Sequence, residues 1–197
     1  MDRLFCSTVD FRPLESLSTL AFVSTLTSAF PLLPQSIRIL DISGNCMIRW
    51  PLQDLAASPL PNHKSLTAGN SYIAKVNVLA ILEPSLEKRS LRSLSLHRCP
   101  RVEFNSLKWL MKHSENLERL AIGGNDTVTD GMLKEVAMFR NLRYLDLSRC
   151  GISGIGLMNV VYGSPGALRE VNVSECINIG LDAVQLAAKS GVKILNG

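Results

Sequence analysis

Cysteine is the residue type in this chain best suited to metal or disulfide chemistry. Cys99, Cys150 and Cys176 occupy one register of a repeated pattern, and their residue numbers differ by 51 and 26 (150−99 and 176−150). That spacing offers no close ligand pair such as C-x-x-C, so it argues against a metal site. A Cys150–Cys176 disulfide would fit strands about 4.8 Å apart, but parallel inward side chains disfavour its torsion. The spacing therefore predicts no metal and favours buried free thiols that pack as small apolar groups.

Acid–base and nucleophilic catalysis would need a histidine beside a nucleophile. The three histidines are His63, His97 and His113, and no G-x-S-x-G sequence accompanies them. The segments GGND (123–126) and GSPG (163–166) are too short for a phosphate-binding loop and lack its Lys-Ser/Thr pair. The sequence therefore predicts a protein that is not an enzyme, with no cofactor and no small-molecule substrate.

The elements that carry these residues come from a nine-residue pattern repeated along the chain. Each copy has apolar residues at positions 1, 4 and 6 and Cys or Asn at position 9. The starts of the last four copies differ in residue number by 26, 25 and 26 (117−91, 142−117 and 168−142). A fixed period of this length is typical of a solenoid, here an α/β solenoid of about six short parallel strands. The copies begin at Ile37, Leu91, Leu117, Leu142 and Leu168.

The period also suggests how the chain is divided. Residues 1–36 are expected to form an N-terminal cap, because a solenoid end exposes apolar surface unless it is covered. Residues 37–197 form the repeat domain. An irregular insertion is expected around 51–90. Prolines, asparagines and a glycine indicate loop over 51–70, and residues 72–82 are expected to form a helix, with a strand as the alternative. Within it, LTAGNSY (66–72) is at best a degenerate copy of the pattern.

A helix is expected after position 9 of each regular copy. Thr129 or Asp130 can cap the start of one such helix, because their side-chain oxygens can accept from free amides of the first turn. Gly191 is expected to end the last helix, and Val192 to open a truncated final strand. The side chains expected to face inward are Met132, Leu133, Val136, Ala137, Ile152, Ile155, Leu157, Val160 or Val161, Leu181, Val184, Leu186 and Ala187.

The open face of the sheet is the best candidate for a binding site. Positions 3 and 5 flank the inward residue at position 4, so they point away from the core, and positions 7 and 8 follow at the turn. Charge along this face passes from basic to acidic, and tyrosine and arginine are types that anchor interfaces. Ala121, Gly123 and Gly124 would leave one strand nearly bare. The predicted partner-binding residues are His97, Arg98, Arg119, Tyr144, Asp146, Arg149, Glu170, Asn172 and Glu175.

Composition limits the partners and the compartment. Of 197 residues, 46% are hydrophobic, and Lys and Arg exceed Asp and Glu by four (21−17) without a basic stripe, which disfavours nucleic acid without excluding it. Residues 17–33 are uncharged and fairly apolar, but Ser, Thr and Pro31 interrupt them. They fall short of the roughly 20 apolar residues that a membrane span needs, so a packed cap and no transmembrane segment are expected. The odd count of five cysteines favours a reducing, intracellular compartment, with mitochondrion and cytoplasm both open. Other protein subunits are the expected partners.

The pattern LxxLxLxxC, followed by a turn and GL, resembles the cysteine-containing class of leucine-rich repeats. The matching segments are LERLAIGGNDTVTDGML (117–133), LRYLDLSRCGISGIGL (142–157) and LREVNVSECINIGL (168–181). The resemblance implies a right-handed β/α leucine-rich-repeat solenoid, similar to ribonuclease inhibitor, whose role is interaction rather than catalysis.

Two groups within this class imply different functions. The repeats look most like those of F-box leucine-rich proteins, which present substrates to SCF-type ubiquitin ligases, although residues 1–36 show no evident F-box. The segment VTDGMLKEVAMFRNLRYLDLS (128–148) is similar to the mitochondrial ATP synthase subunit s (coupling factor B) family. That likeness implies a non-catalytic subunit of a larger multiprotein assembly, in mitochondria.

Overall fold

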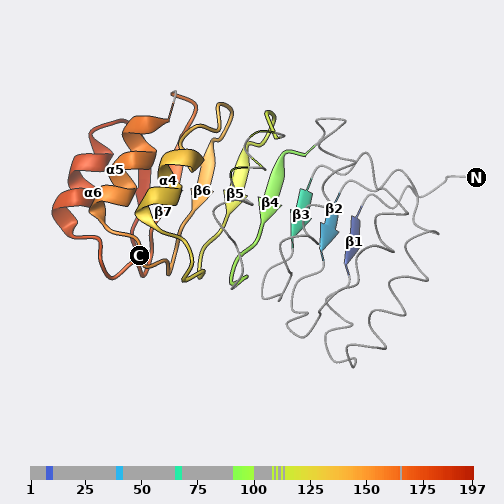
Figure 1. Cartoon of the computed structure of the whole chain (residues 1–197), viewed down its shortest axis with the longest axis horizontal. Helices are drawn as coiled ribbons and strands as arrows, with labels where there is room; N and C mark the ends of the chain where they lie inside the picture. The colour runs from blue at the N-terminus through green and yellow to red at the C-terminus, as the bar shows by residue number, and fades with distance from the viewer. Residues whose placement is uncertain are drawn as a thin grey trace, which may run out of the picture.

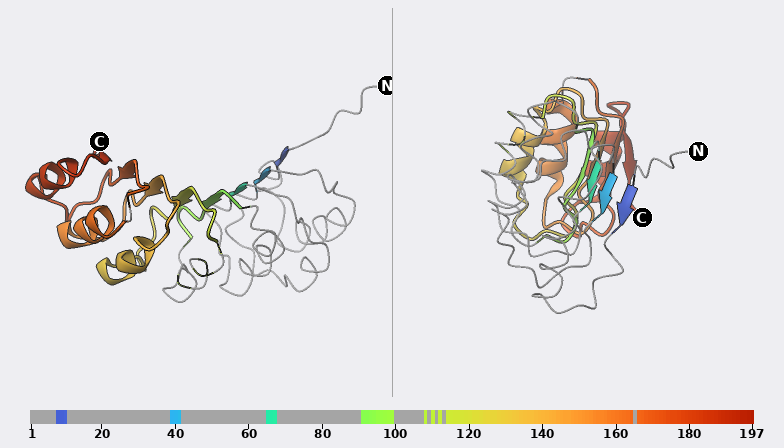
Figure 2. Two further views of the ribbon diagram at one scale, coloured as in Figure 1. Left: turned by 90° about the horizontal axis from the view of Figure 1, so that it is seen from above. Right: turned by 90° about the vertical axis from the view of Figure 1, so that its right-hand side faces the viewer.

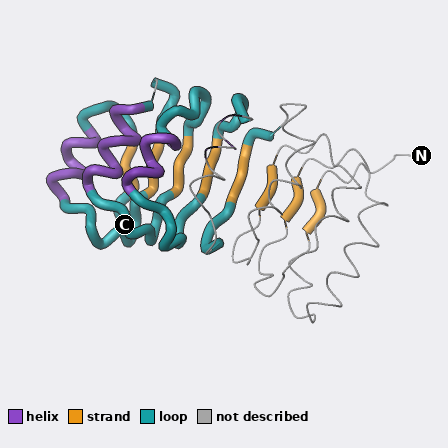
Figure 3. Tube along the Cα trace, in the orientation of Figure 1, coloured by secondary structure: helices purple, strands orange, loops and turns teal. Residues whose placement is uncertain are grey.

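Eight short strands form one parallel sheet in chain order (Figures 1 and 3). The computed structural model describes residues 8–10, 39–41, 65–67, 91–99, 108, 110, 112, 114–164 and 166–197. Every strand has three residues and pairs in register with the next, without a slip. The strands are β1 Thr8–Asp10, β2 Ile39–Asp41, β3 Ser65–Thr67, β4 Ser93–Ser95, β5 Arg119–Ala121, β6 Tyr144–Asp146, β7 Glu170–Asn172 and β8 Lys193–Leu195.

The strand count corrects the expectation of about six strands. Strand β3 lies inside the expected insertion of 51–90, and β1 lies inside the expected cap of 1–36. Both were missed because position 1 of their copies is Cys6 or His63 and position 6 of the β3 copy is Ala68. A three-residue strand needs only its central apolar position, and the rest of the cap and insertion lies outside the described residues.

Three helices pack behind β5–β8, on the face opposite the open one (Figure 2). They are α4 Asp130–Val136, α5 Gly154–Gly163 and α6 Leu181–Ala188. Positions 1, 4 and 6 of the four regular copies are at most 6% exposed, as the pattern predicts. The leucines and valines at these positions meet the buried helix residues, and this contact forms the core of the described repeats.

Most of the inward helix positions are confirmed, and three are wrong. Met132, Leu133, Val136 and Ala137 are all buried. By contrast, Ile155, Leu181 and Leu186 are 69%, 70% and 47% exposed. Each helix starts at a cap residue that fixes its rotation: with Ser153 as N-cap, the buried stripe of α5 is Gly156, Leu157, Val160 and Val161, which leaves Ile155 outside.

The side chain at position 9 joins neighbouring repeats. Asn125 Nδ2 donates to the carbonyl oxygens of Leu96 in the preceding repeat (2.9 Å) and Ile122 in its own (2.7 Å). Cys150 Sγ lies 3.5 Å from the Ile122 oxygen, and Cys176 Sγ lies 3.0 Å from the Leu147 oxygen. These bonds satisfy buried carbonyls at the turns, as the pattern predicts.

A second link joins helices α4 and α5. The Asp130 carboxylate accepts from the Ser153 backbone N–H (2.9 Å) and the Ser153 hydroxyl (2.5 Å). The same hydroxyl accepts from the Ile155 N–H and caps α5. Gly156 is required beside this link, because a Cβ there would collide with the Asp130 carboxylate. Thr129 is the N-cap of α4 but makes no side-chain cap bond, and the carboxylate of Asp130, the other predicted cap, serves the next repeat instead.

Thiol reactivity tests the burial of the position-9 cysteines. Cys150 and Cys176 are free thiols and, like Cys99, are buried; burial raises the pKa of Cys150 from 9.0 to about 11. Since Cys6 and Cys46 lie outside the described residues, the measurement uses a C6S/C46S background. At pH 8 we expect a thiol reagent to titrate three groups in denaturant and almost none in the native protein. A fast reaction of the native protein would contradict the burial.

The raised pKa of Cys150 also makes stability depend on pH. The contribution of this thiol to the free energy of unfolding is complete below about pH 9 and is lost as the pH rises towards 11.

Replacing Asp130 tests the link between the helices. Asp130→Ala leaves the Ser153 N–H and hydroxyl without their acceptor, and we expect a loss of about 1–3 kcal/mol in the free energy of unfolding. Asp126→Ala, a change at an exposed carboxylate one turn earlier, is the control and should change it by less than about 0.5 kcal/mol. Urea denaturation measures both, and equal losses would refute the link.

Candidate protein-binding face

Parallel pairing in register places equivalent residues of successive repeats in rows on the open face. Rows of this kind are spaced by about 4.8 Å from strand to strand. Position 5 supplies Ser95, Ala121, Asp146, Asn172 and Leu195, from β4 to β8. Position 3 supplies the row with most of the charged and aromatic side chains: Ser93, Arg119, Tyr144, Glu170 and Lys193.

Tyr144 lies at the centre of the open face. The Arg119 guanidinium stacks over its ring, 4.5 Å from the centroid, an arrangement that fixes both side chains in an extended contact surface. Burial raises the pKa of the Tyr144 phenol, the negative charges of Asp146 and Glu170 raise it further, and Arg119 opposes them. The phenol is therefore held neutral, with a hydroxyl that can both donate and accept a hydrogen bond.

The two acidic residues at the far end of the face already have partners. Glu170 Oε2 lies 3.0 Å from Lys193 Nζ, and Glu175 Oε1 lies 2.6 Å from an Arg149 guanidinium nitrogen. These pairs are largely exposed, so solvent screening leaves them little effect on stability. These ion pairs therefore cancel the negative charge that the sequence predicts at the acidic end of the face. At the basic end, Arg98 and Arg119 have no carboxylate partner among the described residues.

Two of the predicted binding residues have a structural role. Asp146 Oδ1 accepts from the Ser148 N–H (2.9 Å), and Asn172 Oδ1 accepts from the Ser174 N–H (3.0 Å). A side chain that accepts from the backbone two residues on stabilises the turn after its strand. Sequence reasoning missed this role, although an Asp or Asn two residues before Ser is its recognisable signal.

The expected bare strand at β5 is not bare. A Cβ at Gly123 would lie 2.7 Å from Ser148 Oγ and 2.9 Å from His97 Nδ1, so side chains of both neighbouring repeats already fill that space. Gly124 has φ +67° and is covered by the Arg98 side chain.

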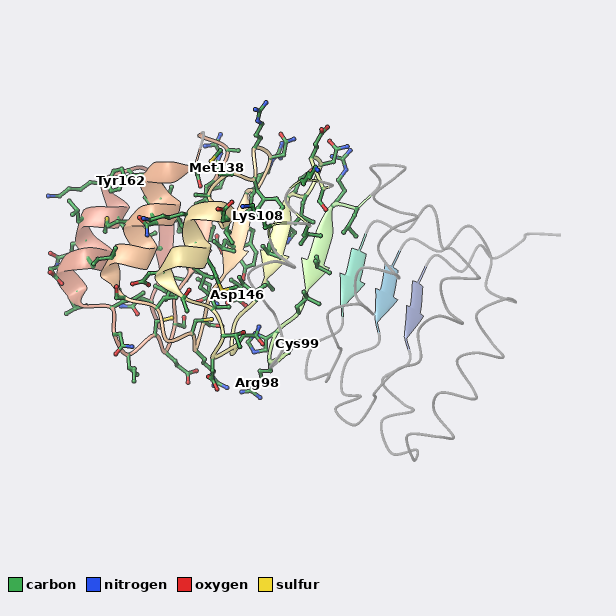
Figure 4. All side chains as sticks on the ribbon, viewed as in Figure 1. Arg98, Cys99, Lys108, Met138, Asp146 and Tyr162 are labelled. Atoms are coloured by element: carbon green, nitrogen blue, oxygen red, sulfur yellow. The ribbon has the colours of Figure 1, made fainter. Side chains whose placement is uncertain are left out.

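The residues at position 8 lie at the edge of the sheet where the strands end. Arg98, Arg149 and Glu175 have φ values of 52°, 59° and 59°, a left-handed conformation that turns the chain away from the sheet. Figure 4 shows Arg98 at this edge, while Met138 and Tyr162 lie at the opposite edge, where the helices end. The structure thus brings Arg119, Tyr144, Asp146, Glu170 and Asn172 together, and keeps His97, Arg98, Arg149 and Glu175 along one border.

The described residues contain no group of three His, Cys, Asp or Glu arranged to hold a metal. Among the same residues, no helix is long and apolar enough to cross a membrane. The candidate site is the polar surface formed by positions 3, 5, 7 and 8 of the repeats.

The fold is that of leucine-rich-repeat proteins. The family described as "Leucine Rich repeat" matches residues 140–161, which hold β6 and the start of its helix. No curated protein sequence matches the chain. The confirmed repeat pattern is consistent with the cysteine-containing class.

Solved structures show the same architecture at low sequence identity. The leucine-rich-repeat protein LegL7 of Legionella pneumophila is similar over 96% of this chain and 65% of its own, with 19% identity and a TM-score of 0.61. An internalin of Listeria monocytogenes (InlF) is similar over 89% of this chain and 44% of its own, with 18% identity and a TM-score of 0.58. A TLR13–ssRNA13 complex matches over 81% of this chain and 22% of that one, at 18% identity and a TM-score of 0.58. The chain thus spans less than two thirds of each of these proteins.

Titration of Tyr144 tests the electrostatics of the face. In a Tyr72→Phe, Tyr162→Phe background, the ultraviolet absorbance of phenolate reports Tyr144 alone, and its pKa should lie above the ordinary value of 10.0. Asp146→Asn keeps an acceptor for the turn but removes the negative charge, so the pKa should fall. Asp182→Asn on α6 is the matched control and should leave it unchanged; a pKa at or below the ordinary value would refute the buried, acid-flanked position.

Proposed function

We propose that the chain is a non-catalytic protein-interaction subunit whose open face binds another protein. The observation that carries this proposal is the stacked Arg119–Tyr144 pair in the middle of a polar face, with Asp146 and Glu170 beside it. Aromatic and arginine side chains that are already held in place lose little freedom on binding, which favours their use as anchors. Leucine-rich repeats generally serve as interaction modules, which supports the same conclusion.

The finer proposal concerns the assembly. The likeness of 128–148 to the coupling factor B family supports a structural subunit of a multiprotein complex in mitochondria. The likeness of the repeats to F-box leucine-rich proteins supports the alternative, a substrate-recognition module of an SCF-type ubiquitin ligase. Proximity labelling in cells distinguishes them: mitochondrial subunits are expected in the first case, and the ligase's linker subunit in the second.

Alanine substitution on the open face tests the binding role. The triple variant Arg119→Ala, Tyr144→Ala, Arg149→Ala removes the stacked pair and one border arginine, and we expect its native partners to fall by about tenfold or more in affinity pull-down with mass spectrometry. The matched control on the helical side is Lys134→Ala, Tyr162→Ala, Lys189→Ala, which should retain them. Unchanged partners with a folded open-face variant would place binding elsewhere.

A further inference from the structure

A ladder of backbone hydrogen bonds lines up the residues at position 2, immediately before each strand. The Arg143 N–H donates to the Glu118 carbonyl (2.8 Å), and the Arg169 N–H donates to the Arg143 carbonyl (2.9 Å). The Glu118 N–H donates in the same way to the Arg92 carbonyl (2.8 Å). The four residues therefore stand side by side, about 4.8 Å apart, along the edge where the strands start.

Charges on neighbouring repeats of this protein are generally opposite and paired. Arg92 and Glu118 are 3.4 Å apart at position 2 itself, and the pairs Arg149–Glu175 and Glu170–Lys193 follow the same rule at positions 8 and 3. Like charges placed opposite one another on a sheet destabilise it. A like-charged pair of neighbours would therefore need another reason to be present.

Arg143 and Arg169 are such a pair. Both are exposed, and within the described residues neither forms an ion pair with a carboxylate. Among the described residues, the Arg169 guanidinium donates to the Gly166 carbonyl, at 3.3 Å. Arg143 and Arg169 are thus exposed arginines on neighbouring repeats, with guanidinium donors left for a partner.

The positive charge continues beyond these two residues. Arg140, on the turn before β6, is exposed and lines a hollow of about 500 Å³ together with Lys112. Glu115 lines the same hollow, and Glu118 flanks the arginine pair on its other side. The basic patch is therefore short and bordered by acids.

We propose that Arg143 and Arg169, extended by Arg140, bind an acidic segment of the partner protein, one that presents Asp or Glu carboxylates. Guanidinium groups bind carboxylates through paired, charge-assisted hydrogen bonds. A nucleic acid fits less well, because its binding draws on a long track of phosphate contacts, and the bordering Glu115 and Glu118 would repel it. This inference rests on the proposed function, since it names the chemistry of the partner at the border of the same face.

A defined peptide tests the acidic partner directly. Binding of a fluorescein-labelled peptide of alternating Glu and Ser is followed by fluorescence anisotropy, beside a matched Gln and Ser peptide. We expect the Glu peptide alone to bind, with affinity falling as salt rises. The Arg143→Gln, Arg169→Gln variant should weaken it by about tenfold, whereas Lys134→Gln, Lys189→Gln, with the same loss of charge, should change it less than twofold.

Three results would overturn the proposal. If both double variants lost the same affinity for the Glu peptide, the peptide would be attracted by net charge alone. If the Gln peptide bound as well as the Glu peptide, carboxylate recognition would be excluded. Tighter binding of a single-stranded oligothymidylate, lost in the Arg143→Gln, Arg169→Gln variant, would assign the patch to nucleic acid instead.

The thermal midpoint of unfolding distinguishes a binding role of the two arginines from a structural one. Arg169→Glu creates an opposite-charge neighbour for Arg143, so the thermal midpoint should stay the same or rise while binding of the Glu peptide is lost. A lower midpoint would show that the two arginines serve the fold. The open-face triple variant retains Arg143 and Arg169, so the pull-down and the peptide measurement test different residues. If that variant loses its partners while the Glu and Gln peptides bind equally well, only the acidic-segment inference is refuted.

Discussion

The hydrogen bonds from the position-9 side chains of Asn125, Cys150 and Cys176 to the preceding repeat are the interaction on which the described repeats depend. A buried turn carbonyl that lacks a donor costs about 1–3 kcal/mol, and these side chains add donors at the turns. Asn125 satisfies two of them with one amide, and Cys150 and Cys176 satisfy one each with a thiol. Because the bonds from Asn125 to Leu96, from Cys150 to Ile122 and from Cys176 to Leu147 reach back one repeat, they fix the distance between successive turns. That distance in turn keeps the strands in register, and the register creates the rows of the open face.

Inward positions could be predicted from sequence because burial selects for one property, an apolar side chain at a fixed spacing. Strands β1 and β3 escaped this reasoning because three of their pattern positions hold Cys6, His63 and Ala68, while the in-register pairing with a neighbour needs no more than the backbone. The helices were harder. Their rotation depends on which residue caps them, and a shift by one residue moves Ile155 from the core to the surface.

The candidate site could be predicted as a face but not as a set of contacts. Spacing identified Arg119 and Tyr144 as outward neighbours, and their register pairing makes the stacking geometrically natural. Sequence could not show that Asp146 and Asn172 use one oxygen each to hold a turn, because Asp and Asn suit both roles. It also could not show that Gly123 is enclosed by His97 and Ser148, since those side chains come from the preceding and the following repeat.

The same register that builds the sheet makes the arrangement of surface charge informative. Each outward residue has a fixed neighbour one repeat away, so an opposite charge there adds a little stability and a like charge removes a little. Exposed pairs of this kind change the free energy of unfolding by less than the turn bonds do, so the fold tolerates either. Having two positive charges on neighbouring repeats, Arg143 and Arg169, therefore does not stabilise the fold. The acidic partner segment proposed above would supply carboxylates to both guanidinium groups.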